Sequence, residues 1–487
     1  MAETILVIDE GTTSTRAMLF ALDGRCLGSA QRELTQHYPA PGLVEHDAAE
    51  IWDRTLQCAR EMVAQAGGAE RIAAIGITNQ RETVVFWDRM TGEPLSHAIV
   101  WQDRRTAELC AGLKAEGHEP AVQAKTGLLL DPYFSASKIG WALQHWPQLR
   151  EAGDRLAVGT VESWLVWKLT GGVHVTDATN ASRTALMAIG SGGWDDGLLA
   201  LFGVPREVLP EIVDSAGSFG ETRLFGAPIP ICGLAGDQQA ATIGQACLSP
   251  GDTKATYGTG AFVLTATGTT LPTSRHRLLA TVAWQLHGQR HYALEGSVFV
   301  AGSLIKWLRD DIGLLATASE SEAVARTVPD NGGVYLVPAL SGLGAPWWRP
   351  DARASISGLS FSATRAHIVR AALEAQAHQT HDLKTAFAGE GCDWTRLRID
   401  GGMAANDWLA QDLADMLGIT VERPGFVETT AMGAAMLAGV GAGLFASLEE
   451  AAALRGDVRV FAPGLPEERR RERLDGWARA VASVLNA

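Results

Sequence analysis

The stretch V-I-D-E-G-T-T-S-T-R-A, residues 7–17, joins an apolar run to a turn made of glycine and hydroxyl side chains. The apolar, β-rich residues 4–9 predict a buried strand, and residues 15–21 predict a second strand after the turn. Asp23-Gly24 is a hairpin signal, and the strand-like residues 25–30 follow it. We therefore expect the chain to begin with three antiparallel strands.

A helix and a buried strand are predicted next. Asp47 and Glu50 have the spacing of a capping box, which predicts a helix that runs to about Ala66. Residues 72–78 form an apolar run that is typical of a buried strand. Strands that alternate with helices in this way indicate an α/β domain.

The opening pattern recurs near the middle of the chain. Residues 252–257 and 261–267 are predicted strands on either side of the turn Gly258-Thr259-Gly260. A later predicted strand, residues 397–400, ends on an acid and precedes a predicted helix over residues 404–417. The chain thus contains two α/β halves, each with a glycine-threonine turn.

Two such halves around a shared cleft are typical of the actin and hexokinase type of phosphotransferase. We therefore expect an α/β, two-domain, actin/hexokinase-like (ribonuclease H-like) ATPase fold with an interdomain cleft. The boundary is predicted near residue 245, which gives domains 1–245 and 246–487. No Pro/Ser-rich linker marks it, so the halves are expected to pack closely and to hinge there.

Length and composition restrict the class of protein. A chain of 487 residues is too long for one hydrophobic core, and a formal net charge of −14 disfavours nucleic acid or anionic lipid as the main partner. The six cysteines, at positions 26, 58, 110, 232, 247 and 392, lack C-x-x-C pairs and disulfide-framework spacing. No signal peptide and no bilayer-spanning apolar segment is recognisable, so a reduced, cytoplasmic protein is expected.

The first turn has the chemistry of a phosphate site. Backbone N–H groups at Gly11 and hydroxyls at Thr12, Thr13 and Ser14 suit phosphate oxygens, although the lysine of a P-loop is absent. Asp9, at the end of the strand, would lie beside these phosphates as a partner of Mg²⁺. The alternative is a hairpin whose hydroxyls satisfy the turn backbone. The second turn favours the phosphate interpretation, because one phosphate chain needs donors from two sides.

Three other motifs have two interpretations each. Asp237, in G-L-A-G-D-Q-Q (233–239), could accept a proton from an attacking hydroxyl, but taken alone it is better explained as a helix N-cap. Arg81 and Glu82 could bind neighbouring hydroxyls of a polyol, or form a surface salt bridge. Trp101 could supply an apolar wall for a carbon chain, or lie in the core.

Two further patterns are set aside as sites. His378 and His381 have the spacing of a metal pair but no third ligand, and we expect them on a solvated helix face. The glycines at 439, 441 and 443 follow a predicted helix, whereas a dinucleotide fingerprint follows a strand.

Several long motifs occur in the order found in one known family. They include D-E-G-T-T-S-T-R-A (9–17), Y-P-A-P-G-L-V-E-H-D (38–47), G-I-T-N-Q-R-E-T (76–83), V-W-Q-D-R-R-T-A (100–107), D-P-Y-F-S (131–135), H-V-T-D-A-T-N-A-S-R-T (174–184), G-D-Q-Q-A-A (236–241), Y-G-T-G (257–260), S-G-L-G-A-P-W-W (341–348) and D-G-G-M-A-A-N (400–406). From the first strand to about Leu444, the chain resembles the FGGY carbohydrate kinase family, and in particular its members that phosphorylate glycerol.

The resemblance implies ATP-dependent phosphorylation of glycerol to sn-glycerol 3-phosphate, with ATP and Mg²⁺ as cofactors and domain 246–487 as the nucleotide-binding one. It implies a role for each matching residue, with Asp237 as the catalytic base in place of a simple cap. The glycerol site would comprise Arg81, Glu82, Trp101, Tyr133, Asp237, Gln238 and Phe262. The nucleotide site would comprise Thr12, Thr13, Ser14, Arg16, Gly258, Thr259, Gly302, Lys306, Gly402 and Asn406, and the metal partners would be Asp9 and Asp237. A homo-oligomer, dimer or tetramer, is also expected.

Some positions depart from the family pattern. Glu10 and Lys306 stand where family members commonly carry Gln, so each is expected to add a charge and to alter nucleotide affinity. Residues 222–230 are shorter than the glycine-rich loop with which some bacterial members bind fructose 1,6-bisphosphate, so inhibition by that ligand is not expected. Two alternatives stay open: a kinase of another small polyol or ketose such as erythritol or xylulose, and a nucleotide-binding regulator without catalysis.

Overall fold

A computed structural model describes residues 3–486, and its first strands follow the sequence pattern. Strands β1 (Thr4–Glu10), β2 (Ser14–Ala21) and β3 (Cys26–Glu33) are antiparallel neighbours, which confirms the predicted start. Strands β5 (Ile72–Asn79) and β14 (Ile229–Gly236) then extend the sheet in parallel with β1. With β13 (Glu221–Thr222) at the edge, the strand order is β13-β14-β5-β1-β2-β3.

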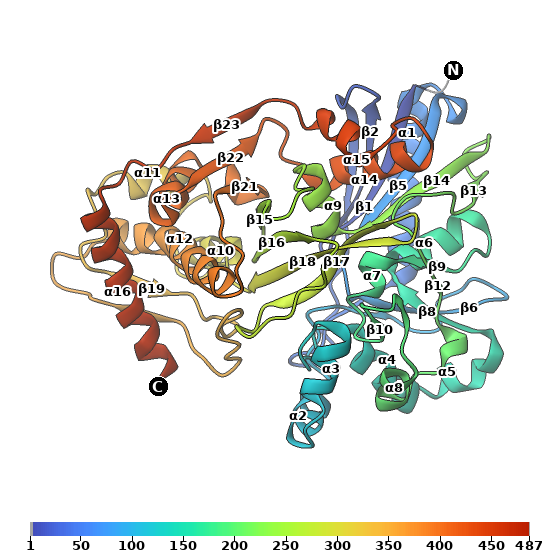
Figure 1. The fold of residues 1–487 in the computed structure, drawn as a ribbon, viewed down its shortest axis with the longest axis horizontal. Coiled ribbons are helices and arrows are strands. Elements are labelled where there is room, and N and C mark those ends of the chain that lie inside the picture. The colour runs from blue at the N-terminus through green and yellow to red at the C-terminus, as the bar shows by residue number, and fades with distance from the viewer. Residues whose placement is uncertain (1–2, 487) are drawn as a thin grey trace.

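A second sheet has the strand order β17-β18-β16-β15-β21-β22-β23. Its strands are β15 (Thr253–Tyr257), β16 (Ala261–Gly268), β17 (Leu279–Leu286), β18 (Gln289–Val298), β21 (Arg396–Asp400), β22 (Thr420–Pro424) and β23 (Val458–Phe461). Strand β15 is antiparallel to β16 and parallel to β21, as β1 is antiparallel to β2 and parallel to β5. The order β18-β16-β15-β21-β22 therefore repeats β3-β2-β1-β5-β14, and this repeat confirms the two-half, ribonuclease H-like architecture (Figure 1).

Alternating side chains of β1 bind it to helices on both faces of the first sheet. Leu6 and Ile8 belong to the core beneath helix α1 (Ala48–Ala66). Ile5 and Val7 point to the other face and pack with helix α14 (Thr429–Gly441). Because all seven residues of β1 are buried, the first sheet is a central layer between helices that lie far apart in the sequence.

Helix α14 packs backbone to backbone against helix α9 (Asp237–Gly244), and the two lie side by side in Figure 1. A Cβ atom added at Gly433 would lie 1.8 Å from the carbonyl oxygen of Ala240, and one added at Gly244 would lie 1.9 Å from that of Thr429. Neither contact leaves room for a methyl group. The two glycines therefore fix the distance between the helices.

The remaining elements form smaller sheets and helices around these two sheets. In the first half, a small sheet is built from β4 (Glu45–His46), β6 (Val84–Asp88), β7 (Ala98–Ile99) and β8 (Leu156–Thr160). The other elements of that half are α2 (Ala107–Ala115), α3 (Glu119–Thr126), α4 (Ser135–His145), α5 (Pro147–Ala152), α6 (Val161–Thr170), β9 (Val175–Asp177), α7 (Ala178–Ala181), β10 (Met187–Ala188), β11 (Gly193–Trp194), α8 (Asp196–Phe202) and β12 (Glu211–Val213). The second half adds α10 (Gly302–Asp310), α11 (Glu320–Ala325), β19 (Tyr335–Val337), β20 (Ser355–Ser357), α12 (Arg365–Gly389), α13 (Asp407–Leu417), α15 (Leu448–Ala451) and α16 (Glu467–Leu485).

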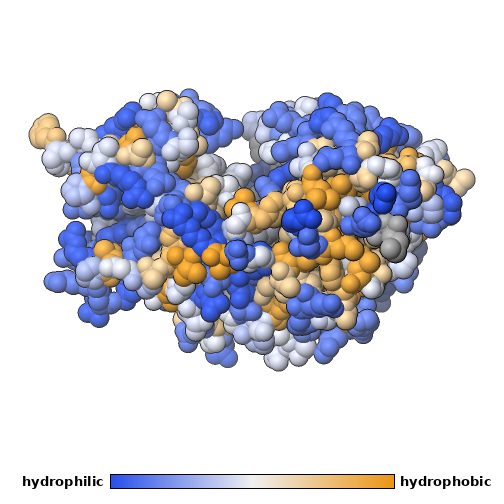
Figure 2. Space-filling model, turned by 90° about the horizontal axis from the view of Figure 1, so that it is seen from above, coloured by the Kyte–Doolittle hydropathy of each residue, from blue (hydrophilic) through white to orange (hydrophobic). Residues whose placement is uncertain are grey.

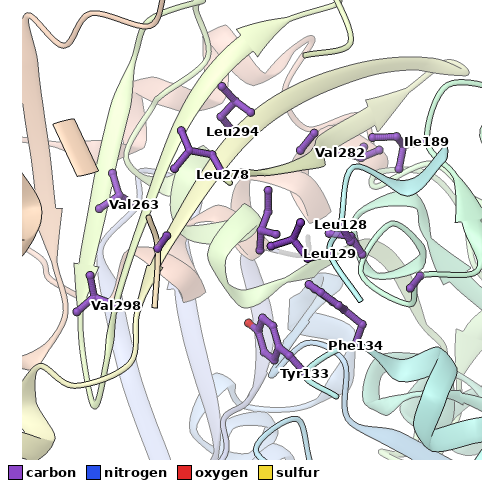
Figure 3. Close-up of a cluster of buried hydrophobic side chains, with 14 of the residues drawn as sticks. Leu128, Leu129, Tyr133, Phe134, Ile189, Val263, Leu278, Val282, Leu294 and Val298 are labelled. Atoms are coloured by element: carbon purple, nitrogen blue, oxygen red, sulfur yellow. The ribbon is translucent and has the colours of Figure 1, made fainter. Parts of the chain in front are cut away.

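One apolar cluster spans the two halves. Figure 3 shows Leu128, Leu129 and Phe134 of the first half facing Leu278, which directly precedes β17, and Val282 of β17 in the second-half sheet. All of these side chains are at most 3% exposed. The segment that precedes α4 is thereby held against the second sheet. On one face of the molecule a notch separates the two lobes (Figure 2).

Three local predictions are wrong. Asp47 caps α1 by accepting from the N–H of Ala49, but Glu50 accepts from Thr35 instead of completing a capping box. The helix expected from residue 404 begins at Asp407, since Asn406 is its N-cap. His378 is 1% exposed and stacks on Trp477, so it does not lie on a solvated face. Its neighbours come from α16, a helix that no local pattern could associate with α12.

Within residues 3–486, none of the helices has both the length and the apolar composition that a membrane crossing requires.

Candidate active site

The site forms where strands of both sheets end. Asp9 of β1 pairs in register with Thr78 of β5, and Gly236 of β14 pairs with Asn79. The residues that follow β5 and β14 therefore meet beside Asp9. The turn after β15 borders the opposite side, and the cavity has a volume of about 420 Å³. Residues of both halves line it.

Arg81 lines this cavity and is almost fully buried. Its Nε is 3.3 Å from Oδ1 of Asp237, and its Nη2 donates to the hydroxyl of Tyr133 at 3.3 Å. The guanidinium also donates to both carboxylate oxygens of Glu295, at 2.6 and 3.2 Å. The alternative of a surface salt bridge is therefore wrong, and Arg81 joins the first half to strand β18 of the second.

Glu82 is held by a second buried arginine. Its Oε1 accepts from Nε of Arg183 at 2.7 Å, and Nη2 of Arg183 donates to Glu295 at 3.0 Å. Burial opposes the ionised form of Glu295, but the charges of Arg183 and Arg81 hold its pKa at about 2. Glu82 also has a φ of 63°, a left-handed conformation that is uncommon outside glycine. The two carboxylates and two guanidiniums fix one another, and Arg81 and Glu82 form the charged floor of the cavity.

An aromatic wall borders the cavity. The ring of Trp101 is 5.6 Å from that of Tyr133 and 6.4 Å from that of Phe262, in both cases edge to face. Trp101 also donates from Nε1 to Oγ1 of Thr12 at 2.9 Å, which links the wall to the first turn. Figure 3 shows Tyr133 beside Phe134 at the margin of the buried cluster. Trp101 is half-buried, as a wall residue and not a core residue would be.

Asp237 is the first residue of α9 and does not cap it. Gly236 occupies the N-cap position, so the interpretation of Asp237 as a simple helix cap is wrong. Its side chain is 34% exposed towards the cavity, while Gln238 beside it accepts from the buried ammonium of Lys254. A carboxylate that is accessible, oriented by Arg81 and set among other polar groups of the cavity suits proton acceptance from a hydroxyl.

A second cavity, of about 730 Å³, continues from the first on the side of the two turns. Predicted nucleotide residues from both halves line it: Thr12, Thr13, Gly258, Thr259, Gly302, Lys306, Gly402 and Asn406. A Cβ at Gly302 would lie 2.6 Å from the carbonyl oxygen of Gly258, so the start of α10 packs directly on the second turn. The side-chain oxygen of Asn406 caps α13, and Lys306 is exposed.

Asp9, Ser14 and Arg16 line the smaller cavity. Burial raises the pKa of Asp9 to about 6, although Arg16 lowers it in part. Arg16 is itself paired with Glu428 at 2.6 Å. No cluster of three His, Cys, Asp or Glu side chains suited to a metal occurs in the described part of the chain. Asp9 and Asp237 on one cavity nevertheless fit Mg²⁺, which commonly takes one or two protein carboxylates and completes its shell with water and phosphate oxygens.

Glu10 points away from the cavity. Its carboxyl lies beneath α1 and accepts from the hydroxyls of Thr15 and Thr55. It is fully buried, and burial raises its pKa to about 8 despite both hydrogen bonds. The expectation of an added charge is therefore wrong at Glu10, because the carboxyl is largely protonated at neutral pH and is neutral like the amide it replaces.

Five charged residues of the site were not predicted as site residues. Arg183, Glu295 and Lys254 are buried beside the cavity, and Asp400 and Glu428 line it. A usable signal exists for two of them: Glu295 interrupts the apolar strand A-L-E-G-S-V (293–298), and Lys254 interrupts T-K-A-T-Y (253–257). A charge inside a buried strand requires a partner, although the sequence does not say which one.

Comparisons with known proteins agree with this geometry. The model of the FGGY family of carbohydrate kinases matches residues 4–244 with its N-terminal domain and 253–442 with its C-terminal domain. The glycerol kinase of Rhodospirillum rubrum is 55% identical, with 99% of this chain and 98% of that protein covered. A crystal structure of Plasmodium falciparum glycerol kinase with ADP is 37% identical, with a TM-score of 0.91 over 99% of this chain and 98% of that one. The xylulose kinase of Rhodospirillum rubrum is 26% identical, with a TM-score of 0.84 over 99% and 98% of the two chains.

Proposed function

The chain belongs to the FGGY family of carbohydrate kinases and phosphorylates glycerol with ATP; we propose that Asp237 is the base that prepares the glycerol hydroxyl for this transfer. The observation that carries the proposal is the 3.3 Å contact between Asp237 and Arg81 in a cavity lined by both turns. The fixed guanidinium orients the carboxylate, which can then accept the proton of a terminal hydroxyl.

Glycerol is proposed to lie between the charged floor and the aromatic wall. Arg81, Glu82 and Gln238 supply hydrogen-bond donors and acceptors for its hydroxyls, and Tyr133 adds a phenol. The rings of Trp101 and Phe262 cover the carbon chain. Since the floor residues are held by other buried charges, little reorganisation is needed when the substrate binds.

ATP is proposed to lie in the larger cavity with its γ-phosphate directed at Asp237. The hydroxyls of Thr12, Thr13 and Ser14, with Arg16, would hold the phosphates from one side, and Gly258 and Thr259 from the other. Gly302, Lys306, Gly402 and Asn406 line the part of the cavity that would take the nucleoside. Two opposed turns thereby replace the single lysine-containing loop of a P-loop enzyme.

Asp9 and Asp237 would hold Mg²⁺, which when bound neutralises charge on the phosphate oxygens. Asp9 suits this role because its carboxylate lines the cavity and is not engaged by any hydrogen bond among residues 3–486. The raised pKa of Asp9, about 6, still leaves it mostly ionised at neutral pH.

We also propose a functional division of the chain at residue 245, with the polyol site mainly in 1–245 and the nucleotide site mainly in 246–487. Closure of the two halves would exclude water, which otherwise competes as phosphoryl acceptor. A cytoplasmic location and a homo-oligomeric state remain predictions. The six free thiols are consistent with a reducing compartment.

Asp237→Asn tests the assigned base. The variant should lose at least about a hundredfold in kcat, since a neutral amide cannot accept the proton, while ADP affinity stays within about twofold. Both are measured by coupled ADP release and by nucleotide titration. An Asp237→Asn enzyme with near-normal turnover would contradict the assignment.

A substrate panel separates the alternatives. Glycerol, erythritol and xylulose are offered with ATP, and glycerol should give the highest kcat/KM. Preference for erythritol or xylulose would favour the other FGGY activities, and ATP binding without ADP release from any of the three would favour a regulator.

A further inference from the structure

A third cavity, of about 430 Å³, lies on the far side of the aromatic wall. Four residues line both this cavity and the 420 Å³ cavity in which glycerol is proposed to bind, called the glycerol cavity below: Trp101, Tyr133, Phe262 and Gly260. The two cavities therefore adjoin at these four residues. The volume lies in the range of small-molecule sites, and nothing in the mechanism above uses it.

The charges on the two sides of the wall are opposite in sign. The glycerol cavity is lined by five carboxylates, Asp9, Glu82, Asp237, Asp400 and Glu428, against the guanidiniums of Arg16 and Arg81. The third cavity is lined by four cations, Arg104, Lys114, Arg277 and Arg353, against the single carboxylate of Asp131. A small anion is therefore attracted to the far side of the wall.

Two of these cations are free to bind a ligand. Arg104 is paired with Asp131 at 3.0 Å, and Lys114 lies 3.4 Å from Glu119. Among residues 3–486, the guanidiniums of Arg277 and Arg353 have no carboxylate partner within salt-bridge distance. A pair of unpaired guanidiniums on one cavity suits the oxygens of a phosphate group.

The backbone of this cavity is held in an unusual conformation. Arg277 and Trp348 have φ values of 59° and 48°, which are rare for residues other than glycine. The two residues are linked, since Nε1 of Trp348 donates to the carbonyl oxygen of Arg277 at 2.7 Å. The Trp348 ring also packs edge to face on Phe299 at 6.0 Å. Strained backbone that is fixed in this way is found preferentially at ligand sites.

We propose that the third cavity binds a phosphorylated polyol of the product class, with its phosphate on Arg277 and Arg353 and its carbon chain against the aromatic wall. The choice of ligand rests on the phosphorylation of glycerol, which turns a neutral polyol into a dianion that the carboxylates of the glycerol cavity repel. The bound product would inhibit the enzyme without competing with glycerol, because the two occupy different sides of the wall.

In the experiment that tests this proposal, the glycerol cavity and the nucleotide cavity are occupied first. The full chain is saturated with glycerol, Mg²⁺ and a non-hydrolysable ATP analogue, and sn-glycerol 3-phosphate is then titrated by calorimetry. One further equivalent should bind, and Arg277→Gln/Arg353→Gln should weaken it at least about tenfold, as expected for the loss of charge-assisted hydrogen bonds. The matched control Arg60→Gln/Arg275→Gln removes the same charge from exposed arginines outside the cavity and should change the affinity less than about twofold.

Several results would overturn the proposal. These are the absence of saturable binding to the filled enzyme, equal binding by the double variant and wild type, and equal affinity for inorganic phosphate and sn-glycerol 3-phosphate. The last result would mean that the aromatic wall contributes nothing. Arg353→Gln alone, which leaves Arg277 and its left-handed backbone conformation unchanged, provides a second variant that does not alter the strained position. Because no turnover is required, failure of this binding is distinguishable from failure of Asp237 as the base.

Discussion

Glu295→Gln should weaken both the fold and the glycerol site. Glu295 accepts three hydrogen bonds from the buried guanidiniums of Arg81 and Arg183, and all three side chains are at most 3% exposed. Glutamine has the same shape but no charge, and its NH₂ group would face a guanidinium donor. The variant therefore leaves two buried cations with less compensation and removes the anchor that holds Arg81 beside Asp237.

The magnitude follows from the pKa of Glu295. Its pKa falls from 4.5 to about 2 in the folded protein, a difference that corresponds to about 3 kcal/mol of preferential stabilisation of the charged form. This agrees with the cost of about 3–5 kcal/mol for removing one partner of a buried ion pair. A misplaced Arg81 should further reduce kcat/KM for glycerol by roughly ten- to a hundredfold. ADP affinity should change little, since Glu295 does not line the nucleotide cavity.

Urea unfolding and steady-state kinetics measure the two effects separately. Glu468→Gln is the matched control, because Glu468 is exposed on α16 and its replacement should shift stability by less than about 0.5 kcal/mol. If Glu295→Gln unfolds within 1 kcal/mol of wild type and keeps kcat/KM within about twofold, the buried network neither stabilises the fold nor positions Arg81.

Three further predictions concern other parts of the molecule. Folding raises the pKa of Glu10 from 4.5 to about 8, so the wild-type protein should lose stability as the pH rises from 4.5 to 8. Between pH 6 and 9 its free energy of unfolding should fall by about 3 kcal/mol relative to that of Glu10→Gln. Parallel pH profiles of the two proteins would refute this. Gly433→Ala should lower the free energy of unfolding by about 1–3 kcal/mol and lower kcat, because the new Cβ would lie 1.8 Å from a carbonyl oxygen of α9. The control Gly112→Ala has no atom within 4 Å of its Cβ and should be neutral or stabilising in thermal unfolding. Trp101→Phe keeps an aromatic ring in the wall but removes the hydrogen bond to Thr12, so the KM values for glycerol and ATP should rise by about two- to tenfold. Unchanged KM values would show that the indole N–H is dispensable.

Much of the fold was predictable from local patterns. The two strand-turn-strand units were recognisable because apolar runs, glycine turns and hydroxyl residues lie close together in the sequence, and the structure confirms both. The position of α14 was not predictable. Its sequence, T-T-A-M-G-A-A-M-L-A-G-V-G (429–441), is small and apolar on every side, so no stripe indicates which sheet it covers.

The site was predictable where its residues come directly after strands. Asp9, Arg81 and Asp237 follow buried strands, and parallel strands bring their carboxyl ends together. Glu295 and Arg183 could not be placed, because their partners are separated by more than a hundred residues and the pairing depends on the packing of the two halves. The neutral state of Glu10 could not be predicted from the sequence either, because its burial beneath α1 depends on the tertiary structure.

The return of α14 to the first sheet constrains how the protein is made on the ribosome. Ile5 and Val7 of β1, with Cys232 of β14, stay uncovered until residues 429–441 have been synthesised. At about 5–20 residues per second, the chain needs about 10–40 s to extend from residue 245 to residue 441. During that time the nascent first half displays an apolar face that favours aggregation. A chain truncated at residue 245 should therefore be recovered in inclusion bodies, and co-expression of residues 246–487 as a separate chain should restore part of it to the supernatant.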